Sequence, residues 1–168
     1  MTTIDVSQQD PEEVGIFIEQ KVLETDQSEV VFEDIPDRFN WLEFYMEPTV
    51  DDNNAGLIRF NDDTGDGNYE SYEIQWASSA DAWVRSDGRF LWLDESDKPV
   101  RGFTLPIFGL NNPDMKTTYM VDSIRLQTPN ARIDAGWWDD DSVVSKIELI
   151  ANSTQFDSGS KFTLFGVE

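Results

Sequence analysis

The stretch LIRFNDDTGDGNYESYEIQW, residues 57–76, decides the fold class predicted for this chain. Residues 57–60 are mostly apolar, and over 72–76 tyrosine, isoleucine and tryptophan alternate with polar residues. An alternation with period two is typical of a half-buried β-strand. Between these segments lie Asn, Asp and Gly, which supply positive φ angles and side-chain-to-backbone hydrogen bonds in tight turns. The stretch therefore predicts two strands joined by a turn, in a hairpin.

The turn also matches much of the calcium-binding loop of an EF-hand. Loop positions 1, 3, 5, 6 and 12 are occupied by Asp62, Thr64, Asp66, Gly67 and Glu73. An EF-hand has a helix on each side of its loop, whereas both flanks here have the spacing of strands. We therefore interpret the run as a turn. The alternative is a calcium ion at its tip, held by Asp62, Asp63 and Asp66, because neighbouring carboxylates attract a hard cation.

The period-two pattern recurs along the rest of the chain. Strand-like segments separated by polar turn clusters lie at residues 41–46, 90–93, 103–108, 119–126, 143–150 and 162–167. Many short strands with polar turns predict an all-β fold, an antiparallel two-sheet sandwich that is jelly-roll-like. Pro106 within its segment predicts an edge strand or a bulge, because proline cannot donate to the ladder.

The N-terminal part of the sequence fits two kinds of element. Asp10 and Pro11, followed by two glutamates, are typical of a helix start. Residues 16–23 also alternate as a strand does, and Gly15 weakens a helix. We expect a first strand over 16–23, with a helix over 10–23 as the alternative. Residues 1–12 are predicted to form a short N-terminal arm, and residues 13–168 a single β-sandwich domain.

The composition excludes several classes of function. The chain has no cysteine and no histidine, which excludes disulfides, thiolate nucleophiles, Cys/His zinc sites and hydrolases with a histidine base. Its net charge is −22, from 12 basic and 34 acidic residues, which predicts no binding to nucleic acid or to anionic membranes. No apolar run is long enough to span a bilayer, and the N-terminus lacks a secretory signal, so we expect a soluble protein made in the cytoplasm.

The acidic residues are spread along the whole chain. In dilute buffer their mutual repulsion strains a small fold, whereas at molar salt the Debye length falls to about 3 Å and the repulsion is screened. We therefore expect a halophilic origin. The alternative is an acidic surface protein of a mesophile.

Three blocks of the sequence, taken in order, resemble a family of β-sandwich structural proteins of tailed viruses. The blocks are VFEDIPDRFNWLEFYM, LIRFNDDTGDGNYESYEI and GWWDDDSVVSKIELIANSTQFDSGSKFTLFGVE. The matching residues are Phe32, Ile35, Pro36, Phe39 and Leu42; Leu57, Arg59, Phe60, Asn61, Asp63, Thr64, Gly65, Asn68 and Tyr69; and Gly136, Trp138, Ile147, Leu149, Phe156, Gly159, Ser160, Phe162, Thr163, Leu164, Phe165 and Gly166. The resemblance covers roughly residue 30 to the end, loosely over 76–128. Phe165 replaces the family's usual tyrosine, and Asp66-Gly67 is an insertion.

The resemblance implies a jelly-roll-like component of the tail, fibre, baseplate or head decoration of a phage or archaeal virus. It brings no catalytic residues. With 34 acidic residues, pairs of neighbouring carboxylates arise by chance and do not indicate a glycosidase. We therefore expect no enzyme, no catalytic residue and no cofactor.

The tryptophans are the candidates for contacts with partners. Trp137 and Trp138 are adjacent, so in a strand they face opposite sides. The pattern of the resembling family places Trp138 in the core, which leaves Trp137 for a subunit interface or for a glycan. Trp83 and Trp92 flank the turn RSDGR, a predicted hairpin tip, and the same two alternatives apply to them. Arg59 lies in a half-buried strand beside many acids, and we expect an ion pair that anchors this strand.

We expect a virion structural protein of a haloarchaeal tailed virus, either a head turret or decoration protein or a tail or baseplate component. It would form a homo-oligomer, a trimer or pentamer, and dock on other virion proteins through its N-terminal arm. Its expected location is the virion, after synthesis in the host cytoplasm. Phe162, Leu164 and Phe165 are expected mostly in the core. The alternative function is a receptor-binding module that recognises host surface glycans.

Overall fold

The computed structural model describes residues 15–168 apart from 51–53, 77–79, 86–89, 94–102, 111, 113, 126–129 and 152–153, and it describes side chains outside 54–55, 66, 73–104 and 121–134. The predicted N-terminal arm, residues 1–12, lies outside the described residues. The elements in chain order are β1 (Ile16–Val22), β2 (Glu29–Phe32), β3 (Trp41–Glu47), β4 (Asn54–Phe60), the 3-10 turn η3 (Asp66–Asn68), β5 (Tyr69–Trp76), β6 (Ala80–Arg85), β7 (Phe90–Leu93), β8 (Phe103–Phe108), β9 (Thr117–Arg125), β10 (Asn130–Trp138), β11 (Ile147–Ala151) and β12 (Lys161–Val167). In the described part of the chain, no helix is long and apolar enough to cross a membrane.

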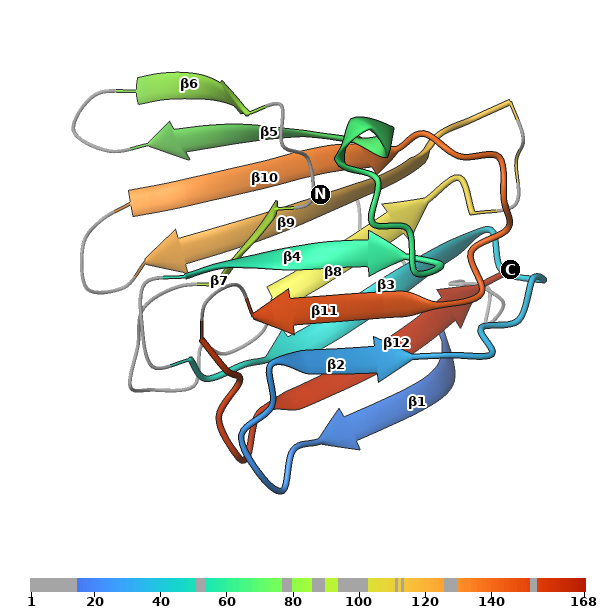
Figure 1. Cartoon of the computed structure of the whole chain (residues 1–168), viewed down its shortest axis with the longest axis horizontal. Helices are drawn as coiled ribbons and strands as arrows, with labels where there is room; N and C mark the ends of the chain where they lie inside the picture. The colour runs from blue at the N-terminus through green and yellow to red at the C-terminus, as the bar shows by residue number, and fades with distance from the viewer. Residues whose placement is uncertain are drawn as a thin grey trace, which may run out of the picture.

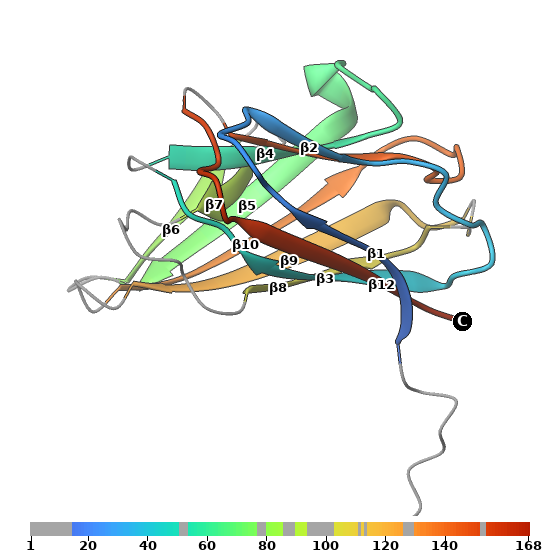
Figure 2. The same cartoon turned by 90° about the horizontal axis from the view of Figure 1, so that it is seen from below.

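The strands form two antiparallel sheets that pack face to face (Figures 1 and 2). The larger, eight-stranded sheet has the order β1-β12-β3-β8-β9-β10-β5-β6, and the smaller, four-stranded sheet has the order β2-β11-β4-β7. These sheets confirm the predicted all-β, antiparallel two-sheet sandwich. The N-terminal segment is a strand, β1, and not the alternative helix over its described residues.

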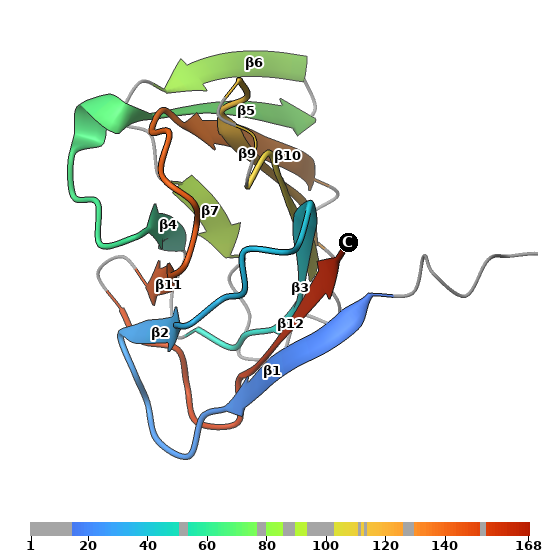
Figure 3. The same cartoon turned by 90° about the vertical axis from the view of Figure 1, so that its right-hand side faces the viewer.

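The connections between the sheets follow a jelly-roll path. Consecutive strands β1 and β2, β3 and β4, β7 and β8, and β11 and β12 each lie in opposite sheets. In the larger sheet β12 pairs with both β1 and β3, while in the smaller sheet β11 pairs with both β2 and β4. Nested pairing of this kind is a jelly roll. The remaining strands, β5, β6, β9 and β10, extend only the larger sheet, which curves around the smaller one (Figure 3).

The hydrophobic core lies between the two sheets and is built from every second residue of their strands. Phe32 and Ile58 of the smaller sheet and Phe44 and Phe162 of the larger sheet are fully buried. The rings of Phe32 and Phe44 meet edge to face across the sandwich, with their centroids 5.0 Å apart. Each buried side chain of this size stabilises the fold by roughly 1.5–3 kcal/mol.

The last strand contributes alternate residues to the core, and one of the three predicted there is wrong. Phe162 and Leu164 are buried, but Phe165 is only half-buried because it faces away from the core on the other side of β12. The inward position after Leu164 is Gly166, and a Cβ there would lie 2.5 Å from the ring of Phe39. The ring of Phe39 therefore fills the space that a side chain at position 166 would occupy.

Both predicted hairpins are wrong. β4 lies in the smaller sheet and β5 in the larger one, so residues 61–68 cross between the sheets (Figure 1). β6 and β7, on either side of the turn RSDGR, likewise belong to different sheets. The residues of a turn determine its local backbone conformation, but they do not determine with which other strands the two flanking strands pair. β4 pairs with β11 and β7, which come later in the sequence, and this pairing decides the path.

Two strand predictions also need correction. Pro106 does not lie on an edge strand, because β8 runs between β3 and β9. The register of β8 with β3 runs unbroken through Pro106, so the predicted alternative of a bulge is also wrong. The pairs of β8 with β9 begin only at Ile107, so the proline lies where the ladder on that side stops. The strand predicted over 143–150 begins at Ile147, and Val143 before it lies exposed in the loop.

The substitution Gly136→Ala tests the packing of β10 against its neighbours. An added Cβ would lie 2.6 Å from the backbone oxygen of Glu70 and 2.5 Å from Cζ of Tyr119, so the sheet must shift to admit it. We expect a loss of about 3 kcal/mol in the free energy of unfolding, measured by urea denaturation. Gly67→Ala is the matched control, because nothing lies within 4 Å of its added Cβ. Equal stabilities of the two variants would contradict the register of β10 with β5.

Candidate functional site

The loop at residues 61–68, which carries the acids of the calcium-like pattern, begins with two residues in the left-handed region. Asn61 has φ 49° and Asp62 has φ 60°, a conformation that Asn and Asp tolerate better than most residues. The side chain of Asn61 bonds to the segment before β11: Nδ2 donates to the carbonyl of Val143 at 2.8 Å, and Oδ1 accepts from the amides of Ser145 at 2.9 Å and Lys146 at 3.1 Å. Asn61 therefore joins two loops that are distant in sequence.

The carboxylate of Asp63 accepts hydrogen bonds from three donors within the protein. Its Oδ1 accepts from the backbone amide of Gly65 at 2.8 Å. Its Oδ2 accepts from Nδ2 of Asn68 at 2.9 Å and from the indole Nε1 of Trp138 at 2.7 Å. Trp138 is 1% exposed, which confirms the prediction that it belongs to the core. Asp63 therefore links the loop directly to β10 of the larger sheet.

A cluster of aromatic rings lies beneath this loop and contains residues from both sheets. Phe60 at the end of β4 stacks on Trp138 of β10, with centroids 5.5 Å apart, and also packs against Tyr69 and Tyr119. The hydroxyl of Tyr69 accepts from the amide of Phe60 at 3.1 Å and donates to the carbonyl of Asp63 at 3.2 Å. These rings and hydrogen bonds thus hold one end of the sandwich together.

The three acids of the calcium alternative have different surroundings. Asp62 lies 2.7 Å from Nζ of Lys146, and Asp63 is bonded to the internal donors given above. The side chain of Asp66 lies outside the described residues. Among the described residues, no group of three or more acids is arranged to hold a metal ion. The described acids of the pattern therefore have structural partners.

A network of charged groups covers the outer face of the smaller sheet. Nε of Arg59 donates to the carboxylate of Glu148 on the neighbouring strand β11, and Glu148 is only 2% exposed. Nη2 of Arg59 also lies 3.5 Å from Glu29, and Nζ of Lys146 lies 3.3 Å from Glu148. The predicted ion pair at Arg59 is confirmed. Removing Arg59 alone would leave a buried carboxylate with one partner fewer, which is more costly than losing an exposed pair.

The network shifts the pKa values of its members. The hydrogen bond from Arg59 to Glu148 raises the pKa of Arg59, and the bond from Lys146 lowers the pKa of Asp62 below its ordinary 3.8. The pKa of Lys146 is raised chiefly by its bond to Asp62. The contribution of Asp62 to stability is therefore present above pH 3.8 and is lost as the pH falls through its lowered pKa. The contribution of Lys146 to stability is lost only as the pH rises through its raised pKa.

The outer face of the larger sheet carries a set of side chains that we call the apolar patch. Its members are the exposed Tyr72, Phe108 and Met120 and the half-buried Trp41 and Trp137. The strand register places them on one face, because Trp41 is opposite Phe108, and Met120 and Tyr72 are both opposite residue 135. Trp41 and Phe108 stack with centroids 5.3 Å apart, and Tyr72 and Trp137 lie 5.2 Å apart. In Figure 2 no described element covers this face.

Trp137 is half-buried within the apolar patch, as its predicted outward position requires. Nζ of Lys116 lies 5.5 Å from its ring centroid and 2.6 Å from Asp139. The side chains of the other two candidate tryptophans, Trp83 and Trp92, lie outside the described residues. Their strands, β6 and β7, belong to different sheets. The three predicted candidates therefore do not lie together on one sheet.

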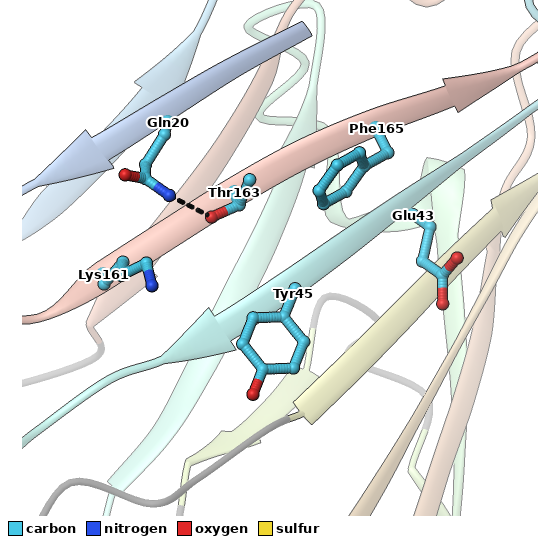
Figure 4. A pocket seen from close by; sticks show the side chains of 6 residues that line it. All are labelled: Gln20, Glu43, Tyr45, Lys161, Thr163 and Phe165. Atoms are coloured by element: carbon cyan, nitrogen blue, oxygen red, sulfur yellow. Dashed lines mark hydrogen bonds between the residues drawn. The ribbon is translucent and has the colours of Figure 1, made fainter. Parts of the chain in front are cut away.

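A shallow hollow of about 380 Å³ lies on the same outer face, over β1, β12 and β3 (Figure 4). We call it the β12 hollow. It is lined by Gln20, Glu43, Tyr45, Lys161, Thr163 and Phe165. The sequence analysis did not predict it, because its residues come from three strands that are far apart in the sequence. Only the pairing of β12 with β1 and β3 brings them together.

Comparisons with known proteins give a limited result. No protein-family model matches the chain, and no curated protein matches it. Among solved structures it is similar to scytalido-glutamic peptidase with a peptide-based transition-state analogue, at 12% identity and a TM-score of 0.31, covering 83% of this chain and 74% of that chain. A second structure, scytalido-glutamic peptidase with a transition-state analogue inhibitor, has 12% identity, a TM-score of 0.28 and coverages of 83% and 75%. The resemblance to tailed-virus proteins stays a prediction.

The prediction that this chain is not an enzyme is contradicted by these two neighbours, both of which are peptidases. The exclusion of catalysis from the sequence is therefore withdrawn. TM-scores this low carry no argument about the activity of this chain, so peptidase chemistry is not assigned to any of its residues.

The substitution Asp63→Asn tests the structural role of the loop. An amide offers one oxygen in place of two, so at least one of the donors from Gly65, Asn68 and Trp138 loses its acceptor. We expect a loss of about 2–3 kcal/mol in the free energy of unfolding, measured by denaturation followed through tryptophan fluorescence. Asp62→Asn is the control, since it removes only an exposed ion pair to Lys146, and it should cost much less stability than Asp63→Asn. Equal losses in both variants, together with a rise in stability on adding calcium, would instead indicate a cation site.

Proposed function

We propose that this chain is a structural component of the particle of a tailed virus of a halophilic archaeon, where it associates with copies of itself and with other virion proteins. The observation that carries the proposal is the apolar patch on the outer face of the larger sheet. The three sequence blocks that resemble tailed-virus proteins support the viral part of the proposal. The net charge of −22 supports the halophilic part.

The apolar patch has the composition of a protein–protein interface. Tryptophan and tyrosine are enriched at the centres of interfaces, where they supply large contact areas. Phe108 and Met120 are exposed although each is a large apolar side chain. A contiguous exposed patch of this kind marks an interaction site more often than scattered apolar residues do. The described acids on the same face are few, with Glu43 and Glu47 on β3 and Glu70 on β5.

The outer face is large enough for a specific contact. Seven strands lie side by side from β1 to β5 in the larger sheet. At about 4.8 Å between strands and about 3.3 Å per residue, they span roughly 29 Å by 23 Å, or about 670 Å² in projection. A typical specific interface buries about 800 Å² of accessible surface on each partner. A second copy of the chain can therefore cover the face, within a trimer or pentamer or in contact with the particle.

Salt determines whether two such chains can approach each other. Each copy carries a net charge of −22, and this repulsion opposes association in dilute buffer. At molar salt the charges are screened beyond about 3 Å, while the burial of apolar surface continues to favour association. The apolar patch would form the contacts between copies, and the acidic residues elsewhere on the surface would keep the assembled protein soluble.

Sedimentation velocity in about 2 M NaCl at about 0.1 mM protein tests this surface. We expect an oligomer for the wild type and a monomer for the double variant Phe108→Ser/Trp137→Ser, because both changes remove outward-facing apolar area. The control is Val143→Ser, which removes an exposed apolar side chain from the loop before β11 and should leave the oligomer intact. A monomeric wild type, or a double variant that still forms the oligomer, would contradict the assignment of the apolar patch to assembly.

A further inference from the structure

We propose that the β12 hollow binds a neutral saccharide. This site lies on the same sheet face as the apolar patch but over different strands, β1, β12 and β3. It involves none of the three tryptophans that the sequence analysis considered for glycan contact. The proposal does not depend on the role of the chain in a virus particle.

An aromatic ring at one end of the hollow is packed against a neighbouring strand. Phe165 is half-buried in β12, and Figure 4 shows its ring between the side chains of Glu43 and Thr163. The ring of Phe17, opposite Phe165 on β1, meets it edge to face with centroids 6.1 Å apart at 74°. Tyr45, two residues from Glu43 on β3, exposes a second aromatic side chain beside it. Rings set in this way offer a rigid apolar surface at little cost in conformational entropy.

Polar groups of several kinds surround these rings. Nε2 of Gln20 donates to Oγ1 of Thr163 at 3.0 Å, which fixes the orientation of the amide. This bond does not use the amide oxygen of Gln20, which can accept from a ligand. Thr163 itself is only 5% exposed, so its hydroxyl serves to hold the Gln20 amide, and the exposed hydroxyl at the hollow is that of Tyr45. Nζ of Lys161 lies 3.3 Å from Glu47, which holds this cation at one side of the hollow. Glu43 supplies a carboxylate acceptor.

This combination fits the chemistry of a sugar ring. A pyranose has faces of C–H groups, which pack on aromatic rings, and edges of hydroxyl groups, which both donate and accept hydrogen bonds. The hollow offers aromatic surface together with amide, carboxylate, hydroxyl and ammonium groups. An apolar ligand would cover these polar groups without satisfying their hydrogen bonds, which disfavours its binding. The volume, about 380 Å³, is at the lower end of the range of about 300–1,000 Å³ for ligand sites.

In dilute buffer the charge of the protein favours a neutral ligand over an anionic one. Glu43 lies within the hollow, Lys161 is paired with Glu47, and the chain carries a net charge of −22. An anionic saccharide would be repelled by this field in dilute buffer. Aromatic stacking and hydrogen bonds to neutral hydroxyls are weakly affected by ionic strength, so a neutral saccharide can bind in dilute and in concentrated salt.

The test is binding of the full chain to an array of immobilised neutral oligosaccharides built from glucose, galactose, mannose and N-acetylglucosamine, followed by calorimetric titration with the best ligand. We expect the affinity to change by less than about threefold between about 0.2 and 2 M NaCl. Tyr45→Ala should weaken binding at least about tenfold, and Glu43→Gln should weaken it without changing the thermal midpoint. Tyr72→Ala is the matched control, because Tyr72 and Tyr45 lie on the same sheet face and are 37% and 38% exposed; it should bind as the wild type does.

Three results would overturn the proposal. The first is no binding to any neutral oligosaccharide of the array up to about 10 mM. The second is binding that Tyr72→Ala weakens as much as Tyr45→Ala, which would move the ligand to the apolar patch. The third is binding only to acidic saccharides or to peptides, with an affinity that falls steeply with salt, since the site would then act through charge. Because a second copy would cover the same sheet face, the array, the titrations and the Tyr45, Glu43 and Tyr72 variants all use the double variant Phe108→Ser/Trp137→Ser as their background, so that absence of binding cannot come from occlusion of the hollow by self-association.

Discussion

The hydrogen bonds accepted by the carboxylate of Asp63 are the constraint on which one end of the sandwich depends. They join the loop after β4, in the smaller sheet, to Trp138 of β10, in the larger sheet. The ring of Trp138 in turn stacks on Phe60, and the hydroxyl of Tyr69 closes the loop onto the backbone of Phe60. The segment that resembles a calcium loop thus stabilises the connection between the two sheets through the side chains of Asp63, Trp138 and Tyr69.

The sequence was sufficient to predict the features that depend on local pattern. Period-two alternation predicted the all-β class and placed Trp137 and Trp138 on opposite faces, while the resemblance to tailed-virus proteins assigned the core position to Trp138. It was insufficient where the outcome depends on pairing between distant strands. The turn residues of 61–68 allow a hairpin and a crossing equally well, and β11, almost 80 residues later, determines which one forms. Phe165 looked like core by its type, but its position relative to Phe162 and Leu164 turns it outward.

The same limit explains why the β12 hollow was not predicted. Gln20, Tyr45 and Phe165 show no shared spacing in the sequence, and each is an ordinary residue of its own strand. Their proximity arises from β12 lying between β1 and β3, a consequence of the nested jelly-roll path. The apolar patch was predicted only at Trp137, because its other members are recognisable as a group only after β3, β8, β9, β10 and β5 are placed side by side.

The two faces of the molecule differ in chemistry, and this difference underlies the proposed function. The outer face of the smaller sheet is covered by ion pairs around Glu148, whereas the larger sheet presents aromatic side chains. A chain with a net charge of −22 that keeps a broad sheet face apolar is suited to assembly in concentrated salt.

The most direct test of the central claim is immunogold labelling of intact virus particles with an antibody to this chain. The account predicts gold on the particle, either at the head vertices and shell or at the tail. Absence of label from intact particles, with the protein present in infected cells, would contradict a structural role in the virion.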